Sequence, residues 1–166
     1  MSVRVSSRRA AFAALLAALA GCTPTPVLKP AAAPIDIAPD AGAVADGRYR
    51  DANVVWGGQI VEVRNRAEVT EIVVDAYPLD AGQRPQTKKD KQGRFVAVLP
   101  GYAESRDFRQ GRFISVTGTL GGSSVEPDGE KPLPVVLVAD SHLWPPGFPN
   151  SGPEVHFAVG VSGGVR

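Results

Sequence analysis

The segment that decides the fold class reads Arg-Phe-Ile-Ser-Val-Thr-Gly-Thr-Leu at positions 112–120. Its even positions from 114 onward carry Ile, Val, Gly and Leu, whereas positions 115, 117 and 119 carry Ser or Thr. Successive residues of a strand point to opposite faces of a sheet, so this two-residue period predicts a half-buried β-strand. Gly111 precedes the strand, and a loop rich in Gly, Ser and acidic residues is expected at 121–130.

Between residues 53 and 145, four other segments are predicted to be short strands and no long window has a helical period. They are residues 54–63, 69–77, 94–99 and 133–144. Within the first, Gly57 and Gly58 indicate a bulge or a sharp bend. A hairpin is expected at Asn65, Arg66 and Ala67, and a long polar loop at 80–92. The segment 102–110 is short enough for a helical turn only.

Five strands with a brief connection between the third and the fourth predict an all-β fold, namely a small OB-like Greek-key barrel of five to six strands. The competing class is an immunoglobulin-like sandwich, which usually needs about seven strands. Alternating valines in 154–161 are compatible with a sixth strand, and a disordered Pro/Gly-rich tail at 146–166 is the alternative.

The N-terminus has the pattern of a secretory signal. Arg4, Arg8 and Arg9 precede an apolar run at 10–20, which is about half the roughly 20 residues that a membrane-spanning helix needs. The following Leu-Ala-Gly-Cys at 19–22 resembles the lipobox of bacterial lipoprotein signals. We therefore expect cleavage after residue 21 and lipid attachment at Cys22, which is the only cysteine. A conventional signal with an incidental cysteine is the alternative, but an unpaired thiol in an oxidising compartment needs an explanation.

Proline and alanine dominate the region that follows Cys22, with few large apolar residues before Gly47. Such a composition cannot bury enough surface to fold alone, so residues 22–48 are predicted to be a lipid-anchored tether of roughly 25–30 Å as a flexible coil. The folded module is expected at 49–145, with few contacts crossing its boundary with the tether.

Charge and reactive side chains exclude several functions. Loss of Arg4, Arg8 and Arg9 with the signal changes the formal net charge from +1 to −2, which argues against nucleic-acid binding. The basic cluster Lys88, Lys89 and Lys91 is interrupted by an aspartate and is best read as a solvated loop. With two histidines fourteen positions apart and one cysteine, no zinc site or Cys/His nucleophile is expected. We predict no enzyme activity, no cofactor and no metal.

Four aromatic residues are candidates for either a ligand face or the core: Trp56, Tyr77, Tyr102 and Trp144. OB folds can stack bases or sugars on such side chains. Core packing is the other interpretation, because a module of this size needs large side chains to fill its centre.

The order of several short motifs resembles the Slp family of bacterial outer-membrane lipoproteins over residues 54–145. The residues that carry the resemblance are Val54, Trp56, Gly57, Gly58, Ile60, Tyr77, Pro78, Leu79, Gly93, Arg94, Phe95, Gly101, Gly111, Arg112, Val116, Gly118, Pro134, Val135, Val136, Leu143, Trp144 and Pro145. One departure concerns two tyrosines that the family tends to carry after a Gly-Glu pair, where this chain has Lys131, Pro132 and Leu133.

This resemblance implies an outer-membrane protein linked to starvation or stress, with no established catalytic activity. Thr23 stands where an aspartate would commonly signal retention in the inner membrane, so the lipobox resemblance also implies delivery to the outer membrane, facing the periplasm. Two hypotheses remain open. The first is a non-enzymatic structural or stress-related lipoprotein, held on the membrane by lipid on Cys22, with an envelope protein as partner. The second is an OB-like binding module for an oligosaccharide or other small envelope ligand.

Overall fold

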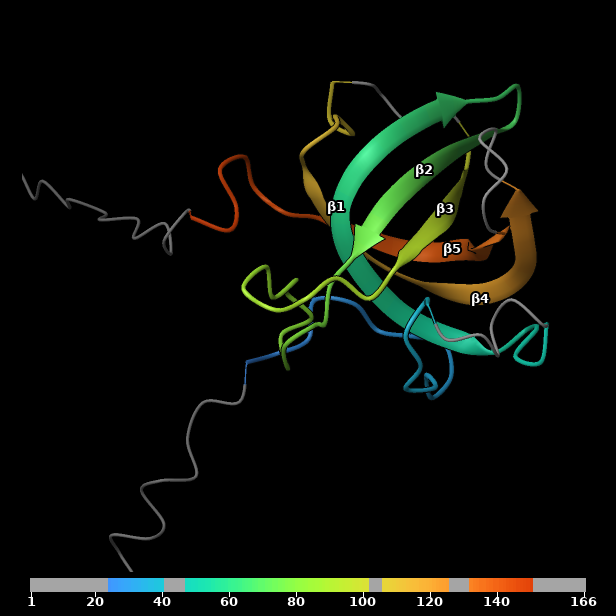
Figure 1. Cartoon of the computed structure of the whole chain (residues 1–166), viewed down its shortest axis with the longest axis horizontal. Coiled ribbons are helices and arrows are strands. Elements are labelled where there is room, and N and C mark those ends of the chain that lie inside the picture. The colour runs from blue at the N-terminus through green and yellow to red at the C-terminus, as the bar shows by residue number, and fades with distance from the viewer. Residues whose placement is uncertain (1–23, 41–46, 102–105, 126–131, 151–166) are drawn as a thin grey trace, which may run out of the picture.

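Five β-strands close into a barrel in the computed structural model (Figure 1). The structure describes residues 24–40, 47–101, 106–125 and 132–150. The strands are β1 (Asn53–Asn65), β2 (Val69–Ala76), β3 (Arg94–Pro100), β4 (Phe113–Val125) and β5 (Pro132–Leu143). They are ordered β1-β2-β3-β5-β4, with β4 pairing back onto β1 and with β3 and β5 parallel. This confirms the all-β, OB-like Greek-key barrel.

The interior of the barrel is filled by one face of each strand. Ile72, Val74 and Ala76 of β2 point inward, as their alternation predicts, and all three are at most 1% exposed. On β4 the even positions Ile114, Val116 and Leu120 do the same. The buried cluster of the core is completed by Val54, Trp56, Ile60, Phe95, Ala97, Leu99 and Val136. A core filled in this way stabilises the barrel by removing apolar surface from water.

The loop predicted directly after residue 120 is wrong at its start. Residues 121–125 are the end of β4 rather than a loop, because β5 supplies backbone partners such as Val135 for Gly122 and Pro134 for Ser123. A segment rich in Gly and Ser has little intrinsic strand preference, and pairing with a long neighbour overrides that deficit. In the segment 102–110, residues 102–105 lie outside the described residues, so the expected helical turn stays a prediction; turns are present within 106–110.

Of the bulge or sharp bend expected at Gly57 and Gly58, the bulge is absent, because β1 pairs with β4 without a register shift from Asn53 to Gln59. The register of β1 shifts instead between Ile60 and Glu62. A Cβ atom on Gly58 would lie 1.9 Å from the carbonyl oxygen of Asp75, and one on Gly57 would lie 2.7 Å from that of Ile114. These glycines therefore allow β2 and β4 to approach β1 closely, which is the other common reason for glycine inside a strand.

The expectation of few contacts between the tether and the barrel is also wrong. Residues 24–40, called the strap below, are bound to the barrel along much of their length. The backbone N–H of Ile35 donates to the Asn53 carbonyl at 2.8 Å, and that of Asp40 donates to the Gln92 carbonyl at 3.0 Å. Ile35 and Ile37 pack against the core. The strap has too few apolar residues for a core of its own, but these residues can extend a core that already exists.

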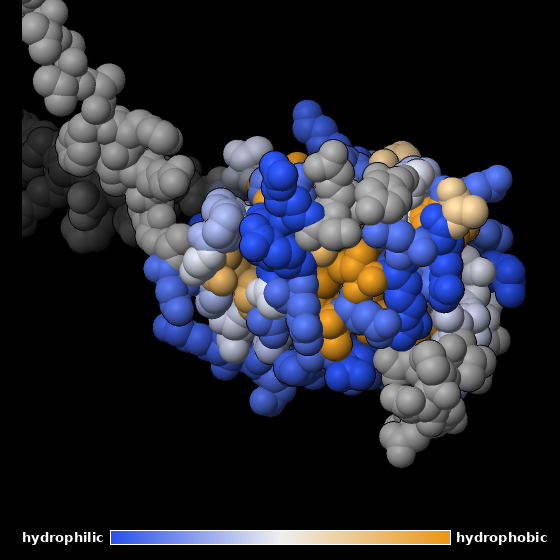
Figure 2. Space-filling model, turned by 90° about the horizontal axis from the view of Figure 1, so that it is seen from above, coloured by the Kyte–Doolittle hydropathy of each residue, from blue (hydrophilic) through white to orange (hydrophobic). Residues whose placement is uncertain are grey.

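The outside of the barrel carries a second apolar cluster. Val73, Val96 and Leu133 are buried there, and Val61, Val98 and Val135 pack against them. Leu137 is 50% exposed. Seen from above, the molecule shows apolar surface among hydrophilic side chains (Figure 2). No helix of the described residues is long and apolar enough to span a membrane.

Candidate functional site

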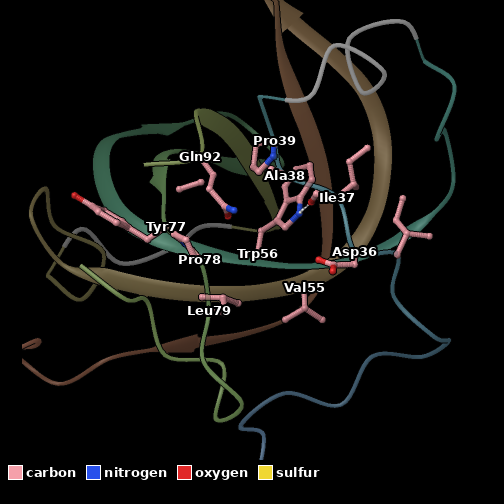
Figure 3. Close-up of a pocket in the computed structure, with 12 residues that line it drawn as sticks. Asp36, Ile37, Ala38, Pro39, Val55, Trp56, Tyr77, Pro78, Leu79 and Gln92 are labelled. Atoms are coloured by element: carbon pink, nitrogen blue, oxygen red, sulfur yellow. Dashed lines mark hydrogen bonds between the residues drawn. The ribbon is translucent and has the colours of Figure 1, made fainter. Parts of the chain in front are cut away.

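The middle of the strap lies over Trp56 of β1. The Trp56 Nε1–H donates to the carbonyl oxygen of Ile37 at 2.8 Å, and the Trp56 ring lies 5.3 Å from that of Phe95 between centroids. A pocket of about 200 Å³ remains beside them, lined by the strap, β1 and the segment after β2 (Figure 3). Its polar lining includes Asp36 and Gln92. The strap therefore builds part of the wall of this pocket.

The start of the strap is held by Gln83 in the connection between β2 and β3. The Leu28 N–H donates to Gln83 Oε1 at 2.6 Å, and Gln83 Nε2 donates to the Leu28 carbonyl at 3.1 Å. Leu28 itself is only 2% exposed. One side-chain amide thus satisfies both backbone groups of a residue that is buried outside any strand, which avoids the cost of unpaired polar groups.

The connection between β2 and β3, residues 77–93, is called the basal loop below. The Asp80 Oδ1 atom accepts from the N–H groups of Gly82 and Arg84 at 2.8 and 2.9 Å. Leu79 forms a bridge with Pro85. Asp80 fixes a turn in this way, as aspartate commonly does. The basal loop can therefore present Gln83 to the strap in one conformation.

Two cations hold Asp75 on the outside of β2. Lys91 Nζ and Arg94 Nε each lie 2.6 Å from a carboxylate oxygen of Asp75. Burial alone raises the pKa of this carboxyl, but the hydrogen bonds from Lys91 and Arg94 outweigh burial, so the pKa of Asp75 falls below its usual value. This contact ties the end of the basal loop to β2 and β3.

Trp144 belongs to a third cluster outside the barrel. It is 6% exposed and packs with Phe113 and Phe148. Its Nε1–H donates to Ser115 Oγ at 3.0 Å, and the Arg84 guanidinium lies 5.4 Å from the centre of its ring. Trp144 and Phe148 thus cover Phe113 and Ser115 on the outer face of β4, and Ser115 Oγ also donates to the Gln83 carbonyl at 2.7 Å.

The aromatic candidates do not form one platform. Trp56 is inside the barrel and Trp144 is outside it, on the other side of the β1 and β4 wall. Tyr77 is half-buried, at the edge of the pocket, with its ring 6.3 Å from Phe113. Tyr102, Cys22 and the segment 154–161 lie outside the described residues. The placement of both tryptophans weakens the stacking-platform interpretation.

Sequence reasoning missed the contacts that hold the strap, in which Leu28 of the strap is bound by Gln83 of the basal loop and Ile37 of the strap by Trp56 of β1. Ile35 and Ile37 stand two positions apart in a stretch otherwise low in large apolar residues, and this signal could have indicated a docked, extended segment. Nothing in the sequence identifies Gln83. In the part of the chain that the structure describes, no group of three or more His, Cys, Asp or Glu residues could hold a metal ion.

The fold and the strap together define a class: OB-type barrels whose N-terminal segment is bound to the barrel and follows a lipobox-like cysteine. The model of the outer membrane lipoprotein Slp family matches residues 19–158, and the chain belongs to this family. This confirms the resemblance seen in the sequence, and with it an outer-membrane lipoprotein.

Two proteins of Escherichia coli K12 are similar to the chain. The "Uncharacterized lipoprotein YeaY" is 34% identical over 68 residues, which cover 41% of this chain and 35% of that protein. The "Outer membrane protein Slp" is 28% identical over 76 residues, which cover 46% of this chain and 40% of that protein. The matched segments therefore span less than half the length of either relative.

Proposed function

We propose that the chain is cleaved after residue 21, carries lipid on Cys22, and acts as a non-enzymatic structural or stress-related lipoprotein on the periplasmic side of the outer membrane. The strap is the observation that carries this proposal. It is hydrogen-bonded to the basal loop at Leu28, six positions after Cys22. The lipid anchor therefore continues almost directly into the folded body.

A short link limits how far the barrel can move from the membrane. Leu28 is six positions after Cys22, and a fully extended chain over six steps spans about 20 Å. A flexible tether ending at residue 48 would have allowed a longer reach. The bound strap keeps the barrel within the layer next to the lipid headgroups, which suits a component of the membrane surface.

Replacement of the cysteine tests the anchoring. Cys22→Ser should leave uncleaved precursor at the inner membrane, because a hydroxyl cannot replace the thiolate that accepts diacylglycerol. Thr23→Ser, a matched control that keeps the thiol, should reach the outer membrane like the wild type. Cell fractionation with immunoblotting measures both. Normal cleavage and outer-membrane delivery of Cys22→Ser would contradict the proposal.

The proposed role in the envelope needs its own measurement. A strain lacking the protein should survive starvation less well than its parent, and Thr23→Ser should restore survival where Cys22→Ser does not. Equal rescue by both variants would show that anchoring is irrelevant to the role.

A second candidate, a binding module for a small envelope ligand, is supported by the pocket beside Trp56 and Tyr77. Its 200 Å³ is below the roughly 300–1,000 Å³ of drug-sized sites, so it suits one sugar ring rather than a chain. Fluorescence of Trp56 in a Trp144→Phe background, titrated with the amino-sugar monosaccharides of peptidoglycan, tests this candidate. A saturable spectral shift is expected, and an unchanged spectrum argues against it.

A further inference from the structure

The basal loop lies next to the point where the chain meets its proposed anchor. A Cβ atom added to Gly82 would lie 3.3 Å from Pro24 Cβ, so the tip of the loop contacts the first described residue of the strap. Two residues of extended chain from Cys22 reach about 7 Å. Lipid on Cys22 would thus place the tip of the basal loop close to the headgroups.

The opposite end of the barrel is turned away from that point. β2 runs from Val69, next to the β1–β2 turn, to Ala76, next to the basal loop. A strand of this length spans roughly 23 Å at about 3.3 Å per residue. In Figure 1 the start of the strap and the basal loop lie together, and the β1–β2 turn is at the other end of β2. Lipid on Cys22 would therefore place the basal-loop end of the barrel, and not the β1–β2 turn, next to the membrane.

The basal-loop end of the barrel is rich in exposed cations. Lys88 and Lys89 are exposed, and neither takes part in an ion pair between described residues. The Oδ1 atom of Asp80 accepts from backbone N–H groups, and the two aspartates of the loop, Asp80 and Asp90, are outnumbered by its one arginine and three lysines. Arg84 is exposed and lies 5.3 Å from the centre of the Phe148 ring. The basal loop thus has positive charge available for an outside partner.

A groove brings these cations together. It has a volume of about 330 Å³ and lies between the basal loop and the segment at Phe148 and Pro149. Its charged lining consists of Arg84, Lys88 and Lys89 together with Asp80. Lysine and arginine near an anionic bilayer surface are attracted to it, and arginine also matches the geometry of a phosphate group. Near the anchor, Val27 of the strap is 39% exposed, which gives the same end an apolar contact.

We propose that the basal loop is the face that the barrel turns to the membrane, with Arg84, Lys88 and Lys89 in contact with the phosphates of anionic phospholipids. This inference rests on the proposed lipid attachment at Cys22. It adds an orientation and a partner: the strap positions the barrel, and the basic groove holds it flat on the lipid surface. The β1–β2 turn then faces away from the bilayer.

Two exposed alanines provide a matched pair of labelling sites for the orientation. Ala81 is in the basal loop and Ala67 is in the β1–β2 turn, and both are exposed. Because Cys22 is the only natural cysteine and its thiol would carry lipid, Ala81→Cys and Ala67→Cys can each be labelled selectively with a fluorophore. The lipoprotein is reconstituted in phosphatidylethanolamine vesicles containing phosphatidylglycerol and a headgroup spin label. Strong quenching at position 81 and weak quenching at 67 is expected, and equal quenching at both overturns the orientation.

Charge removal tests the lipid contact separately. Attraction of about fivefold for each basic residue predicts that Lys88→Gln combined with Lys89→Gln lowers the ratio of docked to undocked barrel about 25-fold. Quenching at position 81 should fall in this variant and in vesicles without phosphatidylglycerol. Arg48→Gln with Arg50→Gln, an equal loss of exposed charge elsewhere, should change little. Unchanged quenching in the lysine variant shows that the strap alone sets the orientation and overturns the headgroup contact.

Failure of the lipid attachment would be recognised independently. Mass spectrometry of the purified protein reports whether Cys22 carries diacylglycerol. If it does not, the proposed function fails, and a maleimide phospholipid coupled to the free Cys22 thiol still supplies the same attachment point. Because a maleimide lipid would also react with a cysteine introduced at position 81 or 67, the fluorophore of that conjugate is placed at these positions as an unnatural amino acid. The quenching experiments then support or overturn the orientation without the natural modification.

Discussion

Docking of the strap can be tested at two neighbouring residues with opposite environments. Leu28 is 2% exposed, whereas Val27 is 39% exposed. Burial of a leucine side chain stabilises a protein by about 1.5–3 kcal/mol, and Leu→Ala at buried sites costs about 2–5 kcal/mol. We expect Leu28→Ala to cost about 2–3 kcal/mol, near the lower end, because the strap can relax more easily than the barrel interior.

Thermal unfolding of the mature chain measures this loss. For a domain of this size about 1 kcal/mol shifts Tm by roughly 4 °C, so Leu28→Ala should lower Tm by about 8–12 °C. Val27→Ala should change the stability by less than about 0.5 kcal/mol, as exposed positions usually do. Hydrogen exchange at the Leu28 amide, which donates to Gln83, should also be faster in Leu28→Ala. Equal, small effects of both variants would refute docking of the strap.

Three further substitutions test other contacts. Trp144→Ala should destabilise the protein by about 3–5 kcal/mol in chemical unfolding, because the indole is buried against the outside of β4. An unchanged unfolding midpoint would show that residues 144–150 do not pack against β4. Asp75→Asn should lower the stability at neutral pH, and its difference from wild type should shrink as the pH falls below about 4. The pKa of Asp75 is lower in the folded protein than the unfolded value of 3.8, so the ionised carboxylate stabilises the fold above that pH and this contribution is lost as acid protonates it. A difference independent of pH would exclude the ion pairs as its cause. Gly58→Ala should lower the free energy of unfolding by at least about 3 kcal/mol, because the new Cβ atom would lie 1.9 Å from the Asp75 carbonyl oxygen. In the control Gly82→Ala the new Cβ atom would lie 3.3 Å from its nearest neighbours, so the Tm should stay near normal.

The strands of the barrel could be predicted because the alternation of apolar and polar residues is a local, periodic pattern in the sequence. Strand β2 was expected at 69–77 and is found at Val69–Ala76, since alternation and a following proline mark both its faces and its end. The end of β4 was not predictable, because 121–125 become a strand only through pairing with β5. Strand pairing between distant segments is a tertiary property that local composition does not contain.

The strap shows where composition misleads. Residues 24–40 look like a disordered linker when judged by their own apolar content, but the surface that binds them is supplied by β1 and the basal loop. A single glutamine side chain, that of Gln83, decides where Leu28 is held, and no local pattern announces such a long-range contact. The lipobox at 19–22, in contrast, is a contiguous motif read by processing enzymes, so its prediction needs no tertiary structure.

The proposed anchoring and the proposed orientation both depend on lipid attached to Cys22, and the mass of the mature N-terminal peptide tests this attachment most directly. The peptide that begins at Cys22, isolated from outer membranes, should carry a thioether-linked diacylglycerol, with an additional amide-linked acyl chain such as palmitate where the host performs that step. Thioether linkage should survive mild alkaline hydrolysis, which removes ester-linked chains only. A mature N-terminus with an unmodified Cys22 thiol, on a protein released with the soluble periplasmic fraction, would contradict the account.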